Sequence, residues 1–126
     1  MNPDTIDIQK RFRRWVESRL GKAAMDSKER ATRMLEEALE LAQAMGVDTY
    51  TAALLWNQVY SKPPGVVWQE LGGAALTLLA CAESSGEVLS QCADRELERI
   101  ETLLPEKFQK RQDMNAQMGI GAPRES

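Results

Sequence analysis

Apolar side chains recur at spacings of three and four along most of the chain, and no stretch alternates cleanly between apolar and polar residues. Spacings of three and four place apolar groups on one face of an α-helix, whereas strict alternation would indicate a half-buried β-strand. The pattern therefore predicts an all-α protein, a helical bundle of four or five helices in a single domain over residues 1–118. Residues 119–126 lack the pattern and are expected to form a disordered tail.

Capping and helix-breaking residues predict where these helices begin and end. Gly21 and Gly46 are expected to end the first two helices, and Ser27 is expected to cap the second. Two prolines in Ser61–Gly65 predict a fixed turn between two further helices, and Pro105 interrupts the last one. The expected helices cover residues 7–20, 27–44, 49–60, 66–84 and 87–104, and a stretch over 106–114 extends the last one after a kink.

The first expected helix has a basic face. Its side chains would suit a membrane or a nucleic acid, but charge runs on helices are more often solvated and salt-bridged, and we favour that interpretation. The residues are Lys10, Arg11, Arg13, Arg14 and Arg19.

Composition narrows the possible functions. The net charge of −3 leaves no surplus of Lys and Arg for a dedicated nucleic-acid binder. Histidine is absent, which excludes Ser-His-Asp and Cys-His nucleophile systems and His-ligated zinc. Cys81 and Cys92 are not spaced as a zinc knuckle or a redox pair. With no secretory signal and no run long enough to span a bilayer, we expect a cytoplasmic protein without a membrane partner.

Three carboxylates share one face of the second expected helix. Glu36, Glu37 and Glu40 fall within an arc of about 100°, opposite a mostly apolar face. Like charges three and four residues apart repel by a few tenths of a kcal/mol per pair unless a cation lies between them. A solvated acidic face is the more frequent outcome for such a motif by itself, so a second observation is needed.

Glu70 is the second observation, because it is the only charged residue between Val66 and Glu83. A helix that is apolar on all sides is expected to be buried, and a buried carboxylate needs an ion pair, a proton or a metal. Small residues at 72–75 would admit a neighbouring helix, so Glu70 could meet the acidic face. A salt bridge to an arginine is the alternative. Four acids without histidine indicate a hard cation, Mg²⁺ or Mn²⁺.

Two further residues of the pattern have open roles. Arg33 lies one turn before Glu37 and either pairs with it or contacts a substrate phosphate. Glu96 shares a face with apolar residues of the last long helix. It is a candidate for a supporting acid behind the metal ligands or for a fourth ligand, and a structural hydrogen bond fits it equally well.

The acidic helix and the segments after it resemble the MazG-like all-alpha nucleoside triphosphate pyrophosphohydrolases. That family combines an EExxE helix with an ExxD helix, and Glu36-Glu37-Ala38-Leu39-Glu40 matches the first part. The stretches ERATRMLEEALELAQAMG, VYSKPPG, QELGGAALTLLA and RELERI are more narrowly similar to phage and bacterial dATP/dGTP diphosphohydrolases. The resemblance covers about residues 15–111. Gly73 stands where the aspartate of ExxD would be, which removes one expected ligand.

The resemblance implies an enzyme that cuts a purine (deoxy)nucleoside triphosphate, such as dGTP, GTP or dATP, between the α- and β-phosphates. It implies homodimers or homotetramers with sites near subunit contacts, and two or three Mg²⁺ or Mn²⁺ ions per site. Metal binding is carried over to Glu37, Glu40 and Glu70, with Glu36 as a further ligand or as the base that orients water.

On the same hypothesis, basic side chains would hold the outer phosphates and an aromatic ring would stack on the base. Lys107 and Arg111 fit a solvated face as well, and each tryptophan also fits the core. The phosphate candidates are Arg30, Arg33, Lys62, Lys107 and Arg111, and the stacking candidates are Trp15, Trp56 and Trp68.

Two other functions remain compatible with the sequence. One is a helical module that binds nucleotide and metal without turnover, which the glycine at position 73 would suit. The other is an acidic bundle that contacts a membrane or a partner protein through its basic first helix, a reading that leaves Glu70 unexplained.

Overall fold

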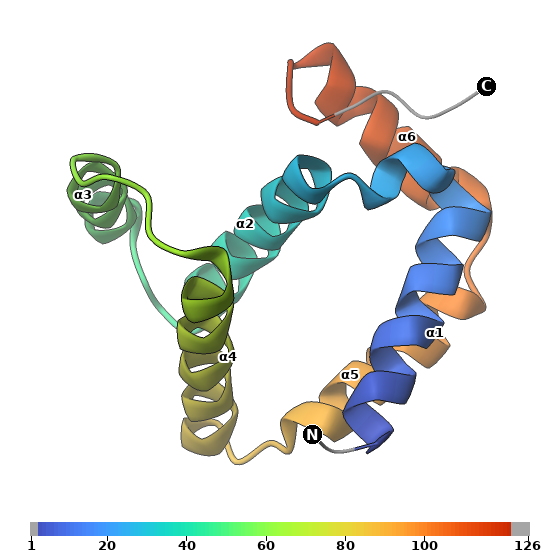
Figure 1. Cartoon of the computed structure of the whole chain (residues 1–126), viewed down its shortest axis with the longest axis horizontal. Helices are drawn as coiled ribbons and strands as arrows, with labels where there is room; N and C mark the ends of the chain where they lie inside the picture. The colour runs from blue at the N-terminus through green and yellow to red at the C-terminus, as the bar shows by residue number, and fades with distance from the viewer. Residues whose placement is uncertain (1–2, 122–126) are drawn as a thin grey trace. The chain divides into compact units, whose positions relative to one another are not determined.

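The computed structural model describes residues 3–121, and in this part of the chain every regular element is a helix. Figure 1 shows the helices in chain order. This confirms the predicted all-α class. The elements are α1 (Pro3–Leu20), the short 3-10 helix η1 (Lys22–Met25), α2 (Ser27–Ala44), α3 (Thr49–Tyr60), α4 (Val67–Ser84), α5 (Leu89–Glu101) and α6 (Pro105–Gln117).

The described residues form six α-helices, whereas four or five were predicted. The additional helix arises because Pro105 starts a helix instead of kinking one. Proline suits the first turn of a helix, where its fixed φ is helical and its missing N–H would have no partner. Leu104, in an extended conformation, precedes the new helix. Chain residues 102–104 therefore separate α5 from α6, and α5 ends three residues before the predicted Leu104.

Most predicted helix ends are confirmed. The limits of α2 and α3 match the expected ranges, and α4 starts one residue late because Val66 is its extended N-cap. Asp48 caps α3 by accepting a hydrogen bond from the backbone N–H of Thr51 at 2.8 Å, and this bond holds the pKa of Asp48 below its ordinary value. At α2 the predicted cap was wrong, since Asp26 rather than Ser27 accepts from the N–H of Glu29.

The chain divides into two compact units. Unit 1 comprises residues 1–35 and 90–126, and unit 2 comprises residues 36–89. Unit 1 contains the hydrophobic core, in which helices from both ends of the chain meet. Trp15 packs edge-on against Phe108 and stacks on Phe12, with ring centroids 4.8 and 5.8 Å away. The buried apolar residues are Trp15, Val16, Ala24, Leu97 and Ile100.

Ion pairs tie α1 to α5 within unit 1. The guanidinium of Arg11 donates to both carboxylate oxygens of Glu101 and to Asp94. Arg13 pairs with Glu17 one turn along α1 at 2.8 Å. Two of the five basic residues of the first helix are therefore salt-bridged, as the favoured interpretation of this face expects.

The described end of the chain closes on Glu29, which is buried. Gly121 has φ +74, and a Cβ at this position would lie 2.6 Å from a carboxylate oxygen of Glu29. Ile120 donates its N–H to the carbonyl of Asn115. Residues 119–121 of the expected tail thus follow a defined path, and residues 122–126 lie outside the described part of the chain.

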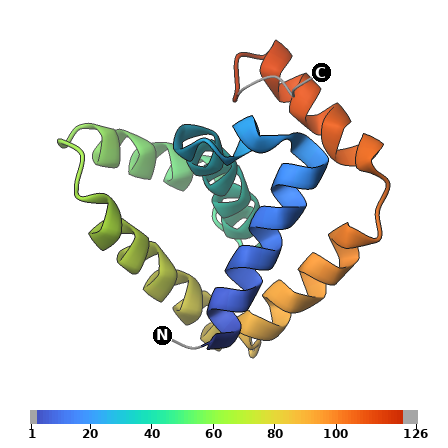
Figure 2. The same ribbon diagram turned by 45° about the vertical axis from the view of Figure 1, so that its right-hand side comes forward.

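Unit 2 contains the last part of α2 and the whole of α3 and α4, and none of residues 36–89 is buried. Figure 2 shows α3 and α4 diverging from the predicted turn that joins them. The helix α4 was expected to be buried, and this expectation is wrong for the single chain. No other element of unit 2 packs over its apolar side chains, and none of its residues is buried. Among the described residues, no helix is long and apolar enough to cross a membrane.

Candidate metal and nucleotide site

The acidic face of α2 is present as the helical spacing predicts. Glu36 is half-buried, and Glu37 and Glu40 are exposed, all in the part of α2 that belongs to unit 2. Because the helix is regular from Ser27 to Ala44, residues 36 and 40 lie one turn apart on one side. The site thus has a rigid helical support for three carboxylates.

Glu70 lies in the first turn of α4, and its side chain is exposed rather than buried. This corrects the expectation of a buried carboxylate that must have a partner. At a helix N-terminus a carboxylate is stabilised by the unpaired backbone N–H groups and by water. Glu70 therefore needs no salt bridge in this position.

The Glu70 carboxylate turns back over Gly65, the last residue of the Lys62–Gly65 segment. A Cβ at position 65 would lie 2.5 Å from the Oε1 atom of Glu70. Any side chain at this position would thus displace the carboxylate. From the sequence, Gly65 was expected only to help form the turn, although its place five residues before Glu70 was the available signal.

The four acids are not gathered into a metal site in one chain. Among the described residues, no three Asp, Glu or Cys side chains are arranged to hold a metal ion. The donor type still fits Mg²⁺ or Mn²⁺, because all four are carboxylates. The structure therefore shows the donor type that was expected but not a grouped set of ligands.

Gly73 lies one turn after Glu70 on α4. A Cβ added at Gly72 or Gly73 would meet no atom within 4 Å. The small residues of α4 therefore make no close helix contact inside this chain. The close approach of another helix, which the sequence led us to expect here, is not seen in the described part of the chain.

Two of the phosphate candidates, Arg30 and Arg33, belong to unit 1. Arg33 pairs with the buried Glu29 at 3.8 Å, one turn before it on α2. Burial lowers the pKa of Arg30, against the attraction of Glu29, and its Nε atom is buried without a hydrogen-bond partner. Both guanidinium groups are thus partly removed from water.

The remaining candidates with ionisable side chains are exposed. Lys62 lies in the turn before α4, and Lys107 and Arg111 lie on α6. Glu96 forms an ion pair with Arg99 at 2.6 Å, and the hydrogen bonds from Arg99 lower the pKa of this carboxyl. Glu96 thus forms the structural hydrogen bond that was one of its expected roles, but in an exposed position, since 57% of its side chain is accessible.

The three tryptophans differ in their surroundings. Trp15 is in the core of unit 1, with one face against Phe12 and an edge contact to Phe108. Trp56 and Trp68 are 60% and 75% exposed in unit 2, and Trp56 lies 6.0 Å from the ring of Tyr60. A free ring face for a nucleotide base is therefore available on Trp68.

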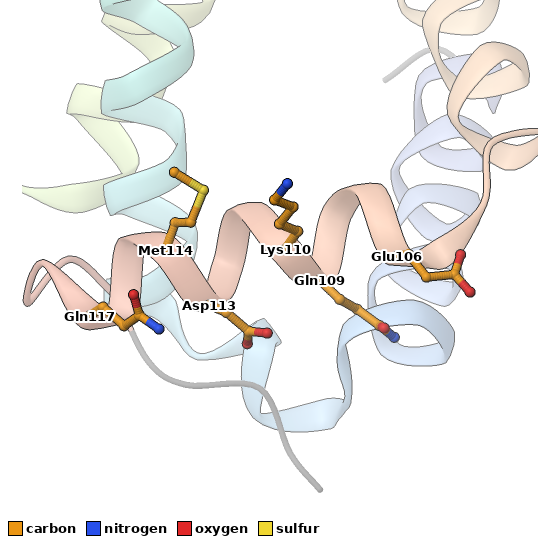
Figure 3. Close-up of a pocket in the computed structure, with 6 residues that line it drawn as sticks. All are labelled: Glu106, Gln109, Lys110, Asp113, Met114 and Gln117. Atoms are coloured by element: carbon orange, nitrogen blue, oxygen red, sulfur yellow. The ribbon is translucent and has the colours of Figure 1, made fainter.

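A separate hollow of about 280 Å³ lies on α6 alone. Figure 3 shows its six side chains, which include two acids and one lysine but none of the predicted metal ligands. A surface from one helix offers no opposing wall, so we assign it no ligand.

Comparison of the chain with protein-family models, with characterised proteins and with solved structures finds no significant match.

Proposed function

We propose that this protein is a Mg²⁺- or Mn²⁺-dependent pyrophosphohydrolase of a purine (deoxy)nucleoside triphosphate, active as a homodimer or homotetramer. Its products are the nucleoside monophosphate and pyrophosphate. The proposal is supported by the carboxylates of α2 and α4. They belong to unit 2, in which no residue is buried. Cys81 and Cys92 form no disulfide in the described part of the chain, and reduced cysteines and a nucleotide substrate fit a cytoplasmic location.

The observation that carries the proposal is the exposure of apolar side chains around the acids. On α4, Trp68, Leu71 and Leu76 are 75%, 66% and 70% exposed, on the same helix as Glu70. Contiguous apolar surface of this extent marks an interaction site. A second copy that covered α3 and α4 would bring further carboxylates to Glu70 and exclude water around them.

The burial pattern of unit 2 also supports association. None of residues 36–89 is buried. Obligate oligomers bury about 2,000–5,000 Å² of largely apolar surface in their interfaces, and the apolar helices of unit 2 offer surface of this kind.

In the proposed site, Glu37, Glu40 and Glu70 hold the metal, and Glu36 completes the set or orients the attacking water. A bound Mg²⁺ or Mn²⁺ would lower the pKa of water and neutralise charge on the phosphates. Glu36 is the half-buried member of the group, and in the proposal its carboxylate orients the attacking water through a hydrogen bond. Lys62 and the unit 1 arginines are candidates for the outer phosphates, and Trp68 for the base.

The test is pyrophosphate release from the common dNTPs and NTPs with Mg²⁺ or Mn²⁺. Wild type is compared with Glu37→Gln, Glu70→Gln and the control Glu83→Gln, an exposed acid at the other end of α4. We expect release from a purine nucleotide, a loss of at least about 100-fold in the first two variants, and full activity in the control.

Absence of release from every nucleotide would contradict the hydrolase. Metal-dependent nucleotide binding without release would instead support the binding module. An equal loss in all three variants would show that the carboxylates of α4 act through general charge and not as ligands.

A further inference from the structure

A groove of about 540 Å³ lies on unit 1, and none of its lining residues is assigned above to metal. It is formed by one face of α1 and by the last residue of α5. The positions on α1 are spaced three and four apart, so they follow one side of the helix. The lining residues are Arg11, Arg14, Trp15, Ser18, Arg19 and Glu101.

The groove has a net positive charge. Glu101 and Asp94 both accept hydrogen bonds from Arg11, so these three groups already satisfy one another. Arg14 and Arg19 also line the groove, and neither forms an ion pair with another residue of the described chain. Two guanidinium groups therefore remain to attract an anion, in a protein whose total charge is negative.

The wall between these arginines is rigid. Trp15 is 8% exposed and is held by Phe12 and Phe108. Its indole N–H is buried and donates no hydrogen bond, which costs folding free energy. Ser18 donates its hydroxyl to the carbonyl of Trp15 at 3.0 Å, so its oxygen can act only as an acceptor. Binding of an anion must therefore rest on the arginines.

We propose that this groove binds a small phosphate polyanion, of the size of pyrophosphate or triphosphate, through the guanidinium groups of Arg14 and Arg19. Guanidinium forms paired hydrogen bonds with phosphate oxygens. The two arginines are five residues apart, about 7.5 Å along the helix axis, which favours an anion with charge at both ends over a single phosphate.

The proposal does not rest on the hydrolase activity, because no metal ligand lines the groove. It also differs from binding of a nucleic acid, which would need a longer basic track than two free arginines.

The test is titration calorimetry of the full chain with sodium pyrophosphate, in low-salt buffer that contains EDTA so that no metal site can form. The variants are Arg14→Gln and Arg19→Gln. The matched control is Arg13→Gln, which removes the same charge from α1 but from a residue paired with Glu17 outside the groove. Circular dichroism of each variant establishes that α1 is still folded.

We expect binding by wild type, a loss of affinity of at least about tenfold in both groove variants, and a change within twofold in Arg13→Gln. Glu37→Gln should bind pyrophosphate like wild type, which separates this site from the metal site. No binding by wild type, or an equal loss in Arg13→Gln, would overturn the proposal. Displacement of pyrophosphate by a short DNA duplex would also overturn it in favour of a nucleic-acid surface.

Discussion

The position of the Glu70 carboxylate in the candidate site depends on a neighbouring residue, Gly65. Glu70 can lie over the Lys62–Gly65 segment only because position 65 has no side chain. The charge of Glu70 was evident in the sequence, and so was its isolation among apolar residues. Its orientation was not, because it depends on the path of a turn five residues earlier. The residue-level prediction follows from this contact.

Replacement of Gly65 by alanine should move the Glu70 carboxylate and leave the fold intact. The new Cβ meets the end of a flexible side chain, and Gly65 has no positive φ, so the free energy of unfolding should stay the same or rise slightly. On the proposed function, Mn²⁺ affinity and turnover should fall on the order of tenfold. Thermal unfolding and a Mn²⁺ titration measure the two effects.

Gly72→Ala is the control for this experiment, because a Cβ there meets nothing within 4 Å in the chain. If both variants lose metal affinity equally, the effect belongs to α4 as a helix, and the role assigned to Gly65 is wrong.

At the level of elements, helix limits were predictable because the residues that set them are local. Asp48, Gly46 and the paired prolines act within a few residues of the ends they define. The short helix η1 was missed, since its four residues show no periodicity. The packing of the helices was less predictable than the positions of their ends. The apolar pattern of α4 indicated that another element packs on this helix, but the sequence did not show whether that element belongs to the same chain.

Acid should weaken the link between α1 and α5. The hydrogen bond from Arg11, reinforced by its charge, lowers the pKa of Glu101 in the folded state. This link therefore adds stability above the ordinary glutamate pKa of about 4.5, and the contribution is lost as the pH falls through the lower folded value. Urea unfolding between pH 7 and pH 3 should show a larger loss for wild type than for Glu101→Gln.

The Glu96→Gln variant provides the comparison, because the pKa of Glu96 is also lowered but its partner Arg99 lies on the same helix. Wild type and Glu101→Gln losing stability in parallel would show that the α1–α5 ion pairs do not contribute over this pH range.

For the whole molecule, the decisive contrast is between the two units. Unit 1 has a core, and unit 2 has apolar helices without one. The four proposed metal ligands belong to the second unit. The sequence predicted their residue types and their helical faces, but a complete metal shell cannot be read from one chain when its remaining members come from another copy.

Leu76→Glu should dissociate the proposed oligomer. Leu76 is 70% exposed in one chain, where a charge would change stability by no more than about 0.5 kcal/mol. In an interface the buried charge would cost several kcal/mol and break the contact. Light scattering coupled to size-exclusion chromatography should give a dimer or tetramer mass for wild type and the monomer mass for this variant.

Met118→Glu is the matched control, with the same 70% exposure but in unit 1. A monomeric wild type, or equal masses for wild type and Leu76→Glu, would contradict the association.

Unit 2 has no buried residues. On the proposed association, the stability and the activity of this protein therefore depend on its concentration. If the apolar helices of unit 2 pack against those of another copy, dilution removes contacts that stabilise the fold. The melting temperature should then rise with protein concentration. Specific activity would then increase with concentration instead of staying constant. A cell could set the output of such an enzyme steeply through expression level alone, because halving the number of chains would lower both the number of sites and the fraction that is complete.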